Sequence, residues 1–324
     1  MKRTFLTLFC LLSLFSFAPQ AQAKEAERLT FVSGPVGGDW YSLGGSIGEI
    51  VKRTVPGVQM TVTTGGGISN GPMIEKGKAD MGLSQAMLYH AQENRLEPYA
   101  GIPAAKNLSA IGYVGYVLQA YFLVKDDSPL KSIEQMIQEK YPVRMVLTTR
   151  SATPELAVRR LLAEYGVTYK DIESWGGKIS FVGFAEAEGM ISDGHCDVYV
   201  GPVLGAIVQM VTTNKMRLLP WKESVIDEVC RKYAYDKQIL PKGKYDFVEK
   251  DTPCMAESNI ILVRRDMSDE LVYNITRAIC ENSDTIRASG PAYINFDPSR
   301  MVQNVGGKFH PGAERYFREQ GWIK

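Results

Sequence analysis

A glycine-rich stretch near the amino terminus holds residues suited to binding chemistry. Residues 33–45 read SGPVGGDWYSLGG, with five glycines and the side chains of Asp39, Trp40 and Tyr41. Glycine lets a backbone approach a ligand closely. The stretch lies between an apolar run and a helical pattern. Three interpretations of the stretch are therefore considered: it could approach a nucleotide phosphate, a catalytic oxyanion or a small bound anion.

Nucleotide binding does not fit the spacing of the glycines. The dinucleotide fingerprint needs G-x-G-x-x-G and an acidic residue about twenty positions later. The run at 65–70, GGGISN, supplies only the first half, and the sequence contains no G-x-x-x-x-G-K-[ST]. We therefore expect no nucleotide cofactor, and no cofactor of another kind is indicated.

Nucleophilic catalysis has one candidate, which its position disfavours. Gly44, Ser46 and Gly48 match G-x-S-x-G, the nucleophile-elbow pattern. That elbow needs its serine at the turn between a strand and a helix. Ser46 follows the apolar run by about a dozen residues, so we expect it inside the helix, where small residues permit close packing. The sequence thus predicts a protein with no catalytic residues, not an enzyme.

Histidine and cysteine spacing gives no metal signal. The three histidines, at 90, 195 and 310, have no second ligand three or four positions away, and there is no C-x-x-C. Four cysteines follow the apolar amino terminus. An even count in an exported protein permits disulfides. Cys230–Cys254 is the favoured pair because both residues flank an irregular stretch, and buried free thiols are the alternative.

Hydrophobic periodicity predicts two series of alternating strands and helices. The first series has strands at 28–33, 58–63 and 80–84 and helices at 42–54, 69–78 and 85–94. The second has strands at 143–148, 179–182 and 197–201 and helices at 154–165, 185–192 and 204–212. A strand at 259–264 and a long helix at 269–289 follow. This alternation is typical of an α/β fold with a mainly parallel sheet.

A repeated turn suggests two lobes of similar build. Gly77-x-x-Asp80 and Gly194-x-x-Asp197 each follow a helix and precede an apolar strand. The carboxyl-terminal strand and helix must pack against one of the lobes, and we expect that to be the first lobe. We therefore expect lobe I at 24–124 plus 256–324 and lobe II at 125–255, joined by two crossings that form a hinge beside a ligand cleft.

The first 23 residues are typical of a secretory signal peptide. Lys2 and Arg3 precede an apolar run that ends in Ala21-Gln22-Ala23, a small-x-small cleavage site. We expect cleavage after Ala23 and a periplasmic protein. Removal of Lys2 and Arg3 changes the formal charge from +1 to −1, which favours neither nucleic acid nor an anionic membrane as partner.

Ligands of open α/β sheets collect beyond the carboxyl ends of the strands. Helix starts at such ends favour anions. Arg150 could hold a carboxylate in a bidentate bond or be a solvated surface residue, and Thr153 before Pro154 could serve the ligand or simply cap its helix. The expected ligand-binding residues are Gly38, Asp39, Trp40, Tyr41, Gly67, Ile68, Ser69, Asn70, Ser84, Gln85, Arg150, Ser151, Thr153, Gly201 and Pro202.

The chain resembles the TAXI family of solute receptors, which serve tripartite ATP-independent periplasmic (TRAP) transporters. The resemblance runs nearly end to end. It rests on the glycine loops at 37–45 and 66–70, both Gly-x-x-Asp turns, RRLL at 159–162, FAEA at 184–187 and the closing HPGAERYFRE at 310–319. The ordered set and that ending carry the match, because each glycine motif alone is common.

The resemblance implies a two-lobed periplasmic binding protein of type II-like build, each lobe a mixed β-sheet with helices on both faces. It implies a small organic anion as ligand, a glutamate-like amino acid or a dicarboxylate. The partner is an integral membrane TRAP permease driven by an ion gradient, and we expect a monomeric receptor. The chain departs from the family at 39–42, where it has DWYS, and at 151–154, where it has SATP. Asp39 could recognise an amino group or cap the following helix.

Two other functions stay open at this point. A similar two-lobed binding protein could serve an ATP-driven (ABC) transporter or a sensor kinase. A periplasmic serine hydrolase would use Ser46, and Ser46→Ala would abolish its activity.

Overall fold

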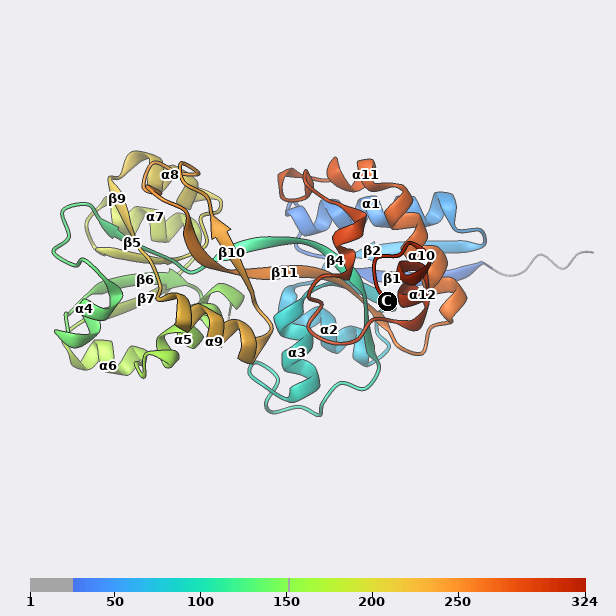
Figure 1. Ribbon diagram of the computed structural model, residues 1–324, viewed down its shortest axis with the longest axis horizontal. Coiled ribbons are helices and arrows are strands. Elements are labelled where there is room, and N and C mark those ends of the chain that lie inside the picture. Colours follow the sequence, from blue (N-terminus) through green and yellow to red (C-terminus); the bar gives the residue numbers. More distant parts are fainter. Residues whose placement is uncertain (1–25, 151) are drawn as a thin grey trace, which may run out of the picture.

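The computed structural model describes residues 26–150 and 152–324, and Figure 1 shows two lobes joined by long strands. The predicted signal peptide and Ser151 lie outside the described residues. Lobe I is built on the six-stranded sheet and lobe II on the five-stranded sheet. No helix within the described ranges is both long and apolar enough to cross a bilayer.

Lobe I begins with a β-α-β-α-β unit. Its elements are β1 (Glu27–Val32), α1 (Asp39–Thr54), β2 (Val58–Thr63), α2 (Gly67–Glu75), β3 (Met81–Gln85) and α3 (Ala86–Asn94). Strand β1 pairs in parallel with both β2 and β3. The predicted apolar face of α1, with Leu43, Ile47, Ile50 and Val51, is buried.

Lobe II repeats this unit. Its elements are β5 (Tyr121–Lys125), α4 (Ile133–Gln138), β6 (Arg144–Thr148), α5 (Thr153–Glu164), α6 (Tyr169–Ser174), β7 (Lys178–Val182), α7 (Phe184–Ser192), β8 (Val198–Gly201), α8 (Ala206–Thr213), β9 (Met216–Leu219) and α9 (Glu223–Tyr233). Strand β6 pairs in parallel with both β7 and β8. The two Gly-x-x-Asp turns occupy equivalent places, before β3 and β8, and Gly77 and Gly194 both have positive φ.

Two long strands connect the lobes. They are β4 (Leu108–Gln119) and β11 (Thr252–Arg264), which pair antiparallel, and β10 (Asp236–Leu240) pairs with the first part of β11. Figure 1 shows β4 and β11 running from one lobe to the other. Strand β5 follows β4 at once and belongs to the sheet of lobe II. The first crossing therefore lies near Ala120, earlier than the expected boundary at 124.

The remaining elements return to lobe I. They are α10 (Asp269–Glu281), α11 (Ser283–Arg287), η1 (Pro291–Tyr293), η2 (Pro298–Val302) and α12 (Pro311–Glu319). The prediction of one long helix over 269–289 was wrong at Asn282, which ends α10 and begins α11. Helices α1, α10 and α12 share one core with β1 and β3.

One hydrophobic cluster spans both lobes. Met87, Leu88 and Tyr99 of lobe I pack in the same buried cluster as residues of α5 and α9 in lobe II. Burial of apolar side chains is the main driving force for such contact. The lobes are therefore packed together on the α3 side of the connecting strands.

Candidate functional site

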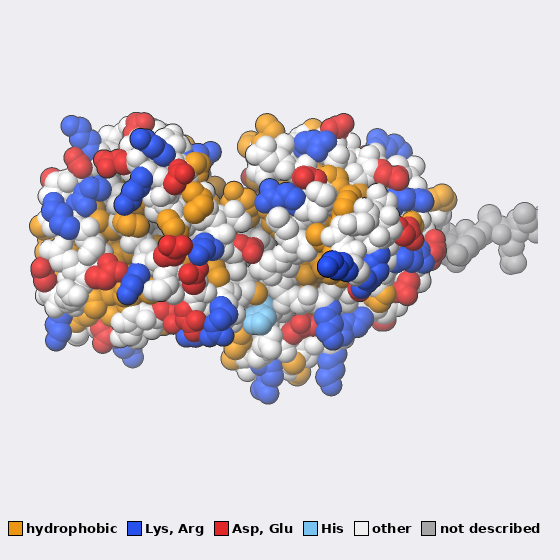
Figure 2. Space-filling view, viewed as in Figure 1, with side chains coloured by type: hydrophobic (Ala, Val, Ile, Leu, Met, Phe, Trp, Pro, Cys, Tyr) orange, Lys and Arg blue, Asp and Glu red, His pale blue; other side chains and the backbone are white. Residues whose placement is uncertain are grey.

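An interlobe cleft lies on the other side of the connecting strands. Figure 2 shows a deep notch between the two lobes. Where the notch reaches β4 it contains a cavity of about 440 Å³. Lobe I lines this cavity with Asp39, Tyr113, Tyr116 and Arg300, and lobe II lines it with Tyr121, Leu204, Lys244 and Tyr245. A ligand in this cleft would touch both lobes.

The glycine-rich stretch 33–45 enters the cleft as a helix start. Helix α1 begins at Asp39, earlier than predicted, so Asp39, Trp40 and Tyr41 lie in its first turn rather than in a loop. Asp39 is exposed and lines the cavity. Trp40 packs against the core of lobe I, whereas the side chain of Tyr41 remains 37% exposed. Of these three side chains, Asp39 thus reaches the cavity, and Tyr41 is accessible to solvent.

Asn70 holds three strand ends of lobe I together. Its side chain is completely buried, and its Nδ2 donates to Ser33 O at 2.7 Å and to Leu83 O at 2.8 Å. Its Oδ1 accepts from the backbone N–H of Gly66 at 2.8 Å. Both amide protons are therefore used within the protein. We assign Asn70 the positioning of the binding loops rather than direct contact with a ligand.

The first turn of α2 carries three of the other expected residues. Gly67 is half-buried, and a Cβ added there would come within 2.9 Å of Gln85 Oε1. Ile68 packs against the cluster that spans the lobes. Ser69 is exposed, and its hydroxyl donates to Gly66 O at 3.1 Å. Ser69 is thus accessible and bonded within its own turn, Gly67 lies close to Gln85, and Ile68 has a packing role.

Six helices follow the carboxyl ends of the parallel strands, and none has a side-chain cap. At each of these N-caps the side chain makes no hydrogen bond to the helix. The N-cap residues are Gly38, Gly66, Gln85, Ala152, Gly183 and Gly205. In contrast, side chains cap α4, α6, α10 and α12. Helices α9 and α11 also lack a side-chain cap, but neither of them follows the carboxyl end of a parallel strand. Unpaired N–H groups at a helix start favour an anion.

Three side chains from different elements meet where the lobes join. Gln85, at the end of β3, donates from Nε2 to Glu257 and lies 3.4 Å from Thr153 Oγ1. The Thr153 hydroxyl donates to Glu257 Oε2 at 3.1 Å. Of the two roles considered for Thr153, ligand binding and helix capping, the capping role was wrong. Ala152 is the N-cap, because the hydroxyl of Thr153 is engaged by Glu257 of β11.

Glu257 is a fully buried acid, with 1% of its surface exposed. Burial raises the pKa of its carboxyl from 4.5 to about 7, against the lowering effects of the Thr153 hydrogen bond and of the Arg160 charge. Its Oε1 has no hydrogen-bond partner, and neither has Gln85 Oε1. The junction therefore holds two buried acceptors that no described protein group satisfies.

The expected contacts of lobe II are separated in this structure. Arg150 is exposed and stacks on Phe181, with 3.9 Å from its Cζ to the ring centroid. It lines a lobe II pocket of about 450 Å³ beside α5 and α6. Gly201 and Pro202 are buried, and Pro202 O accepts a 2.7 Å hydrogen bond from the Tyr199 hydroxyl. Gly201 and Pro202 thus shape the loop before α8, and Ser151 lies outside the described residues.

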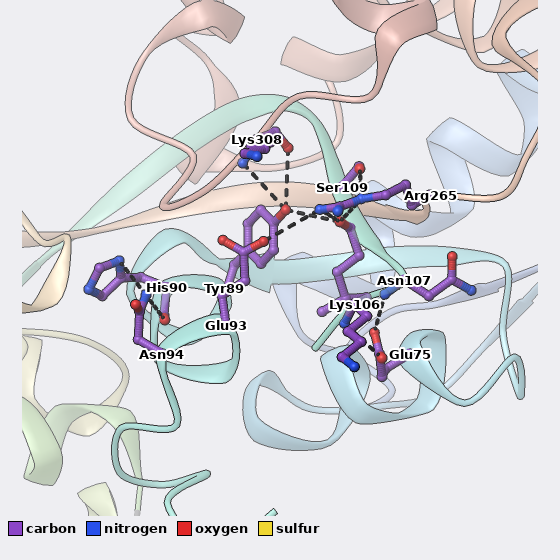
Figure 3. A network of polar contacts seen from close by, with 11 residues as sticks. Glu75, Tyr89, His90, Glu93, Asn94, Lys106, Asn107, Ser109, Arg265 and Lys308 are labelled. Carbon is purple, nitrogen blue, oxygen red and sulfur yellow. Dashed lines mark hydrogen bonds and ion pairs between the residues drawn. The ribbon is translucent and has the colours of Figure 1, made fainter. Parts of the chain in front are cut away.

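A polar network fixes α3 and thereby the strand end at Ser84 and Gln85. The Tyr89 hydroxyl donates to Leu108 O at 3.0 Å. Figure 3 shows Tyr89 beside Arg265, which contacts Ser109 and Glu93. Burial raises the pKa of Tyr89 to about 12, so this phenol keeps its proton. The network binds lobe I elements to each other and has a structural role. Ser84 itself is buried in β3.

The residues considered for catalysis or metal binding have structural surroundings. Ser46 lies inside α1, as predicted. His310 caps α12 by accepting from Gly312 N, and burial lowers its pKa. Within the described residues no group of three or more His, Cys, Asp or Glu side chains could hold a metal ion.

The favoured disulfide was wrong. All four cysteines of the described chain are free. Cys230 lies on α9 beside the cluster that spans the lobes, and Cys254 lies on β11 in the separate core of lobe II. Different cores hold the two thiols. Burial raises the pKa of both, to about 12, which keeps them unreactive.

Sequence reasoning missed Glu257 as a site residue. It was covered only by the prediction that residues 256–324 belong to lobe I. One signal was available: the triplet Glu257-Ser258-Asn259 interrupts an otherwise apolar strand, MAESNIILV at 255–263. Acids are almost never fully buried unless paired. A polar triplet in a buried strand therefore indicates a site or a junction.

Comparison with known proteins agrees with this architecture. The family described as NMT1-like matches residues 31–321. The crystal structure of a TctC solute binding protein from Polaromonas, without ligand, aligns with a TM-score of 0.55 at 15% identity, over 93% of this chain and 100% of that one. XAC2383 from Xanthomonas citri, bound to ATP, aligns with a TM-score of 0.52 at 10% identity, over 90% and 95%. The two-lobed fold of periplasmic binding proteins, expected from the sequence, is confirmed.

Proposed function

The chain belongs to the NMT1-like family, and from that premise we propose that it is a periplasmic solute receptor for a small organic anion. The anion, a glutamate-like amino acid or a dicarboxylate, binds between the lobes. The protein binds and releases this ligand without changing it. The signal peptide predicted at 1–23 brings the receptor to the periplasm.

The six uncapped helix starts around the junction carry this proposal. They come from both lobes, and the contact of Gln85, the N-cap of α3, with Thr153 brings the starts of α3 and α5 together. Micromolar affinity corresponds to about −8 kcal/mol, and association costs at least ~4 kcal/mol. Charge-assisted hydrogen bonds contribute ~1.5–3 kcal/mol each. About five or six such bonds from these starts supply the required energy.

Closure of the lobes couples binding to delivery. A ligand that touches both lobes favours the closed state by its higher affinity for that state. The ordered motifs shared with the TAXI receptors support a TRAP permease, driven by an ion gradient, as the partner. Uptake in vesicles that contain the permease would then require the receptor and the gradient but not ATP. ATP-dependent uptake would instead favour the ABC-transporter alternative.

The ligand class is tested by a thermal-shift screen of the protein without residues 1–23. The panel contains amino acids, dicarboxylates, 2-oxoacids and sugars. We expect at least one carboxylate to raise the melting temperature in a concentration-dependent manner, because a ligand that binds only the folded state stabilises it. Stabilisation by sugars alone, or by nothing in the panel, would contradict the anion-receptor proposal.

A further inference from the structure

Buried polar atoms without partners gather where the lobes join. Six such side-chain atoms occur in the described residues, and three are on strands that meet at the junction: Gln85 Oε1, Gln119 Oε1 and Glu257 Oε1. The register places Gln85 opposite Asn259 and Gln119 opposite Met255, so both flank Glu257 on β11. A buried acceptor left without a donor costs about 1–3 kcal/mol. This part of the molecule therefore has unused capacity to accept hydrogen bonds.

The Glu257 carboxyl lacks a cationic partner within the described chain. Its Oε2 receives hydrogen bonds from two neutral groups, the Gln85 amide and the Thr153 hydroxyl. Arg160 of α5 is the cation whose charge acts on it. The Arg160 guanidinium is already used, since it donates to Tyr235 Oη at 3.1 Å and to Glu97 O at 2.6 Å. A buried carboxylate in this position needs either a proton or another cation.

The free acceptors lie beside the starts of α2 and α5, where the lobes are packed together. A Cβ at Gly67 would stand 2.9 Å from Gln85 Oε1, so the backbone at the start of α2 lies close to this buried oxygen. Gly67 is also the first residue of α2, and Thr153 is the first residue of α5. The two helix starts that favour a carboxylate thus adjoin the two acceptors that favour a donor.

We propose that Glu257 and Gln85 recognise a protonated amino group on the ligand. This inference rests on the proposed function and narrows it. The ligand is an amino acid whose carboxylate meets the starts of α2 and α5 and whose ammonium group donates to Glu257 Oε1 and Gln85 Oε1. Asp39, the residue that the sequence offered for this role, is exposed on the cavity wall. Solvent weakens an ion pair there, so the buried acid discriminates more strongly.

Matched ligand pairs test this inference by isothermal titration calorimetry. The pairs are L-glutamate with glutarate and L-aspartate with succinate, with 2-oxoglutarate and 2-hydroxyglutarate added to separate an amino group from other substituents. We expect an amino acid to bind at least tenfold more tightly than its partner without the amino group. In Glu257→Gln this preference should fall to less than about threefold, with the affinity for the diacid unchanged or increased.

Glu249→Gln is the matched control, because Glu249 is exposed and the substitution is chemically identical. The control should keep the wild-type preference. A diacid that binds wild type as tightly as its amino acid partner would overturn the inference while leaving the receptor function intact. So would an unchanged preference in Glu257→Gln, or tightest binding of 2-hydroxyglutarate. Failure of every carboxylate to bind would overturn both the inference and the proposed function.

The pH dependence of binding provides a second measurement. The groups that face Glu257 are Arg160, Tyr235, Gln85 and Thr153, and burial raises the pKa of Tyr235 far above neutrality. The pKa of Glu257, about 7, lies in the range that the measurement covers. An ammonium ligand competes with the proton on Glu257, so the amino acid should bind severalfold more tightly at pH 8 than at pH 6. The diacid and the Glu257→Gln variant should lack this rise, and an equal rise for the diacid would contradict the inference.

Discussion

The two lobes have the same topology but hold their cleft edges differently. Both sheets contain a parallel three-strand unit in equivalent order, β2-β1-β3 and β7-β6-β8, with an antiparallel strand beside the third member. In lobe I one buried side chain, Asn70, connects the ends of all three strands. In lobe II the corresponding ends use separate contacts, such as Arg150 on Phe181 and Tyr199 on Pro202.

This difference indicates a division of labour. A preorganised lobe binds without further loss of conformational freedom, because its loops are already fixed. The edge of lobe I is of this kind. The edge of lobe II is joined to the rest of its lobe by fewer shared bonds, so it can adapt as the cleft closes. We expect the ligand to bind lobe I first and lobe II on closure.

Removal of the Asn70 side chain should lower the unfolding free energy more than any of the other substitutions. It therefore tests the difference between the two lobes most directly. Asn70→Ala leaves two carbonyl groups and one N–H group at buried strand ends without their partner. At about 1–3 kcal/mol for each unsatisfied group, we expect a loss of about 4 kcal/mol in unfolding free energy, measured by urea titration. Ligand affinity should fall as well. Arg150→Ala, at the equivalent edge of lobe II, should cost less than about 1 kcal/mol. Equal losses in the two variants would contradict the division of labour.

Glu257 belongs to neither edge, and its hydrogen bonds reach one residue of each lobe. Its folded pKa of about 7 lies above the value of 4.5 for an unperturbed carboxyl. Between these values the folded protein binds more protons than the unfolded protein, so stability falls as pH rises. The full contribution is present below about pH 4.5 and is lost by about pH 7.

Glu257→Gln should therefore remove a pH-dependent loss of stability. At ~1.4 kcal/mol per pKa unit, the free energy of unfolding of the variant should gain about 3 kcal/mol on wild type between pH 4.5 and pH 8. Urea titrations at a series of pH values, without ligand, measure this difference. Glu249→Gln should instead follow wild type throughout. Parallel curves for wild type and Glu257→Gln would show that the buried carboxyl does not retain its proton.

The contrast between the lobes explains what the sequence could predict. Local patterns sufficed for both β-α-β-α-β units, because apolar periodicity and Gly-x-x-Asp turns are contained within a few residues. The strand ends near the cleft were also predictable from chain order. The partners of Thr153 and Asn70 were not, because each depends on contacts with distant residues. Glu257 is 104 residues from Thr153, and no local pattern places a junction acid against a helix start.

The two Gly-x-x-Asp turns also allow the lobes to be compared, with the smallest expected changes in unfolding free energy. Asp80 and Asp197 occupy equivalent positions and both form an ion pair, but their surroundings differ. Asp80 lies 3.5 Å from Arg264 and also accepts a 2.7 Å hydrogen bond from Thr30 N, and its side chain is only 18% exposed. Asp197 pairs with Arg144, and both side chains are at least 40% exposed.

Exposed ion pairs contribute about 0–1 kcal/mol, whereas loss of a partner to a buried N–H costs about 1–3 kcal/mol. Asp80→Ala should therefore lower the unfolding free energy by about 1–2 kcal/mol and Asp197→Ala by about 0.5 kcal/mol. Added salt should reduce the effect of Asp197→Ala more than that of Asp80→Ala, since screening acts mainly on exposed charges. If the two substitutions lowered the unfolding free energy equally and with the same salt dependence, the two turns would be stabilised in the same way. The rigidity of lobe I would then rest on Asn70 alone.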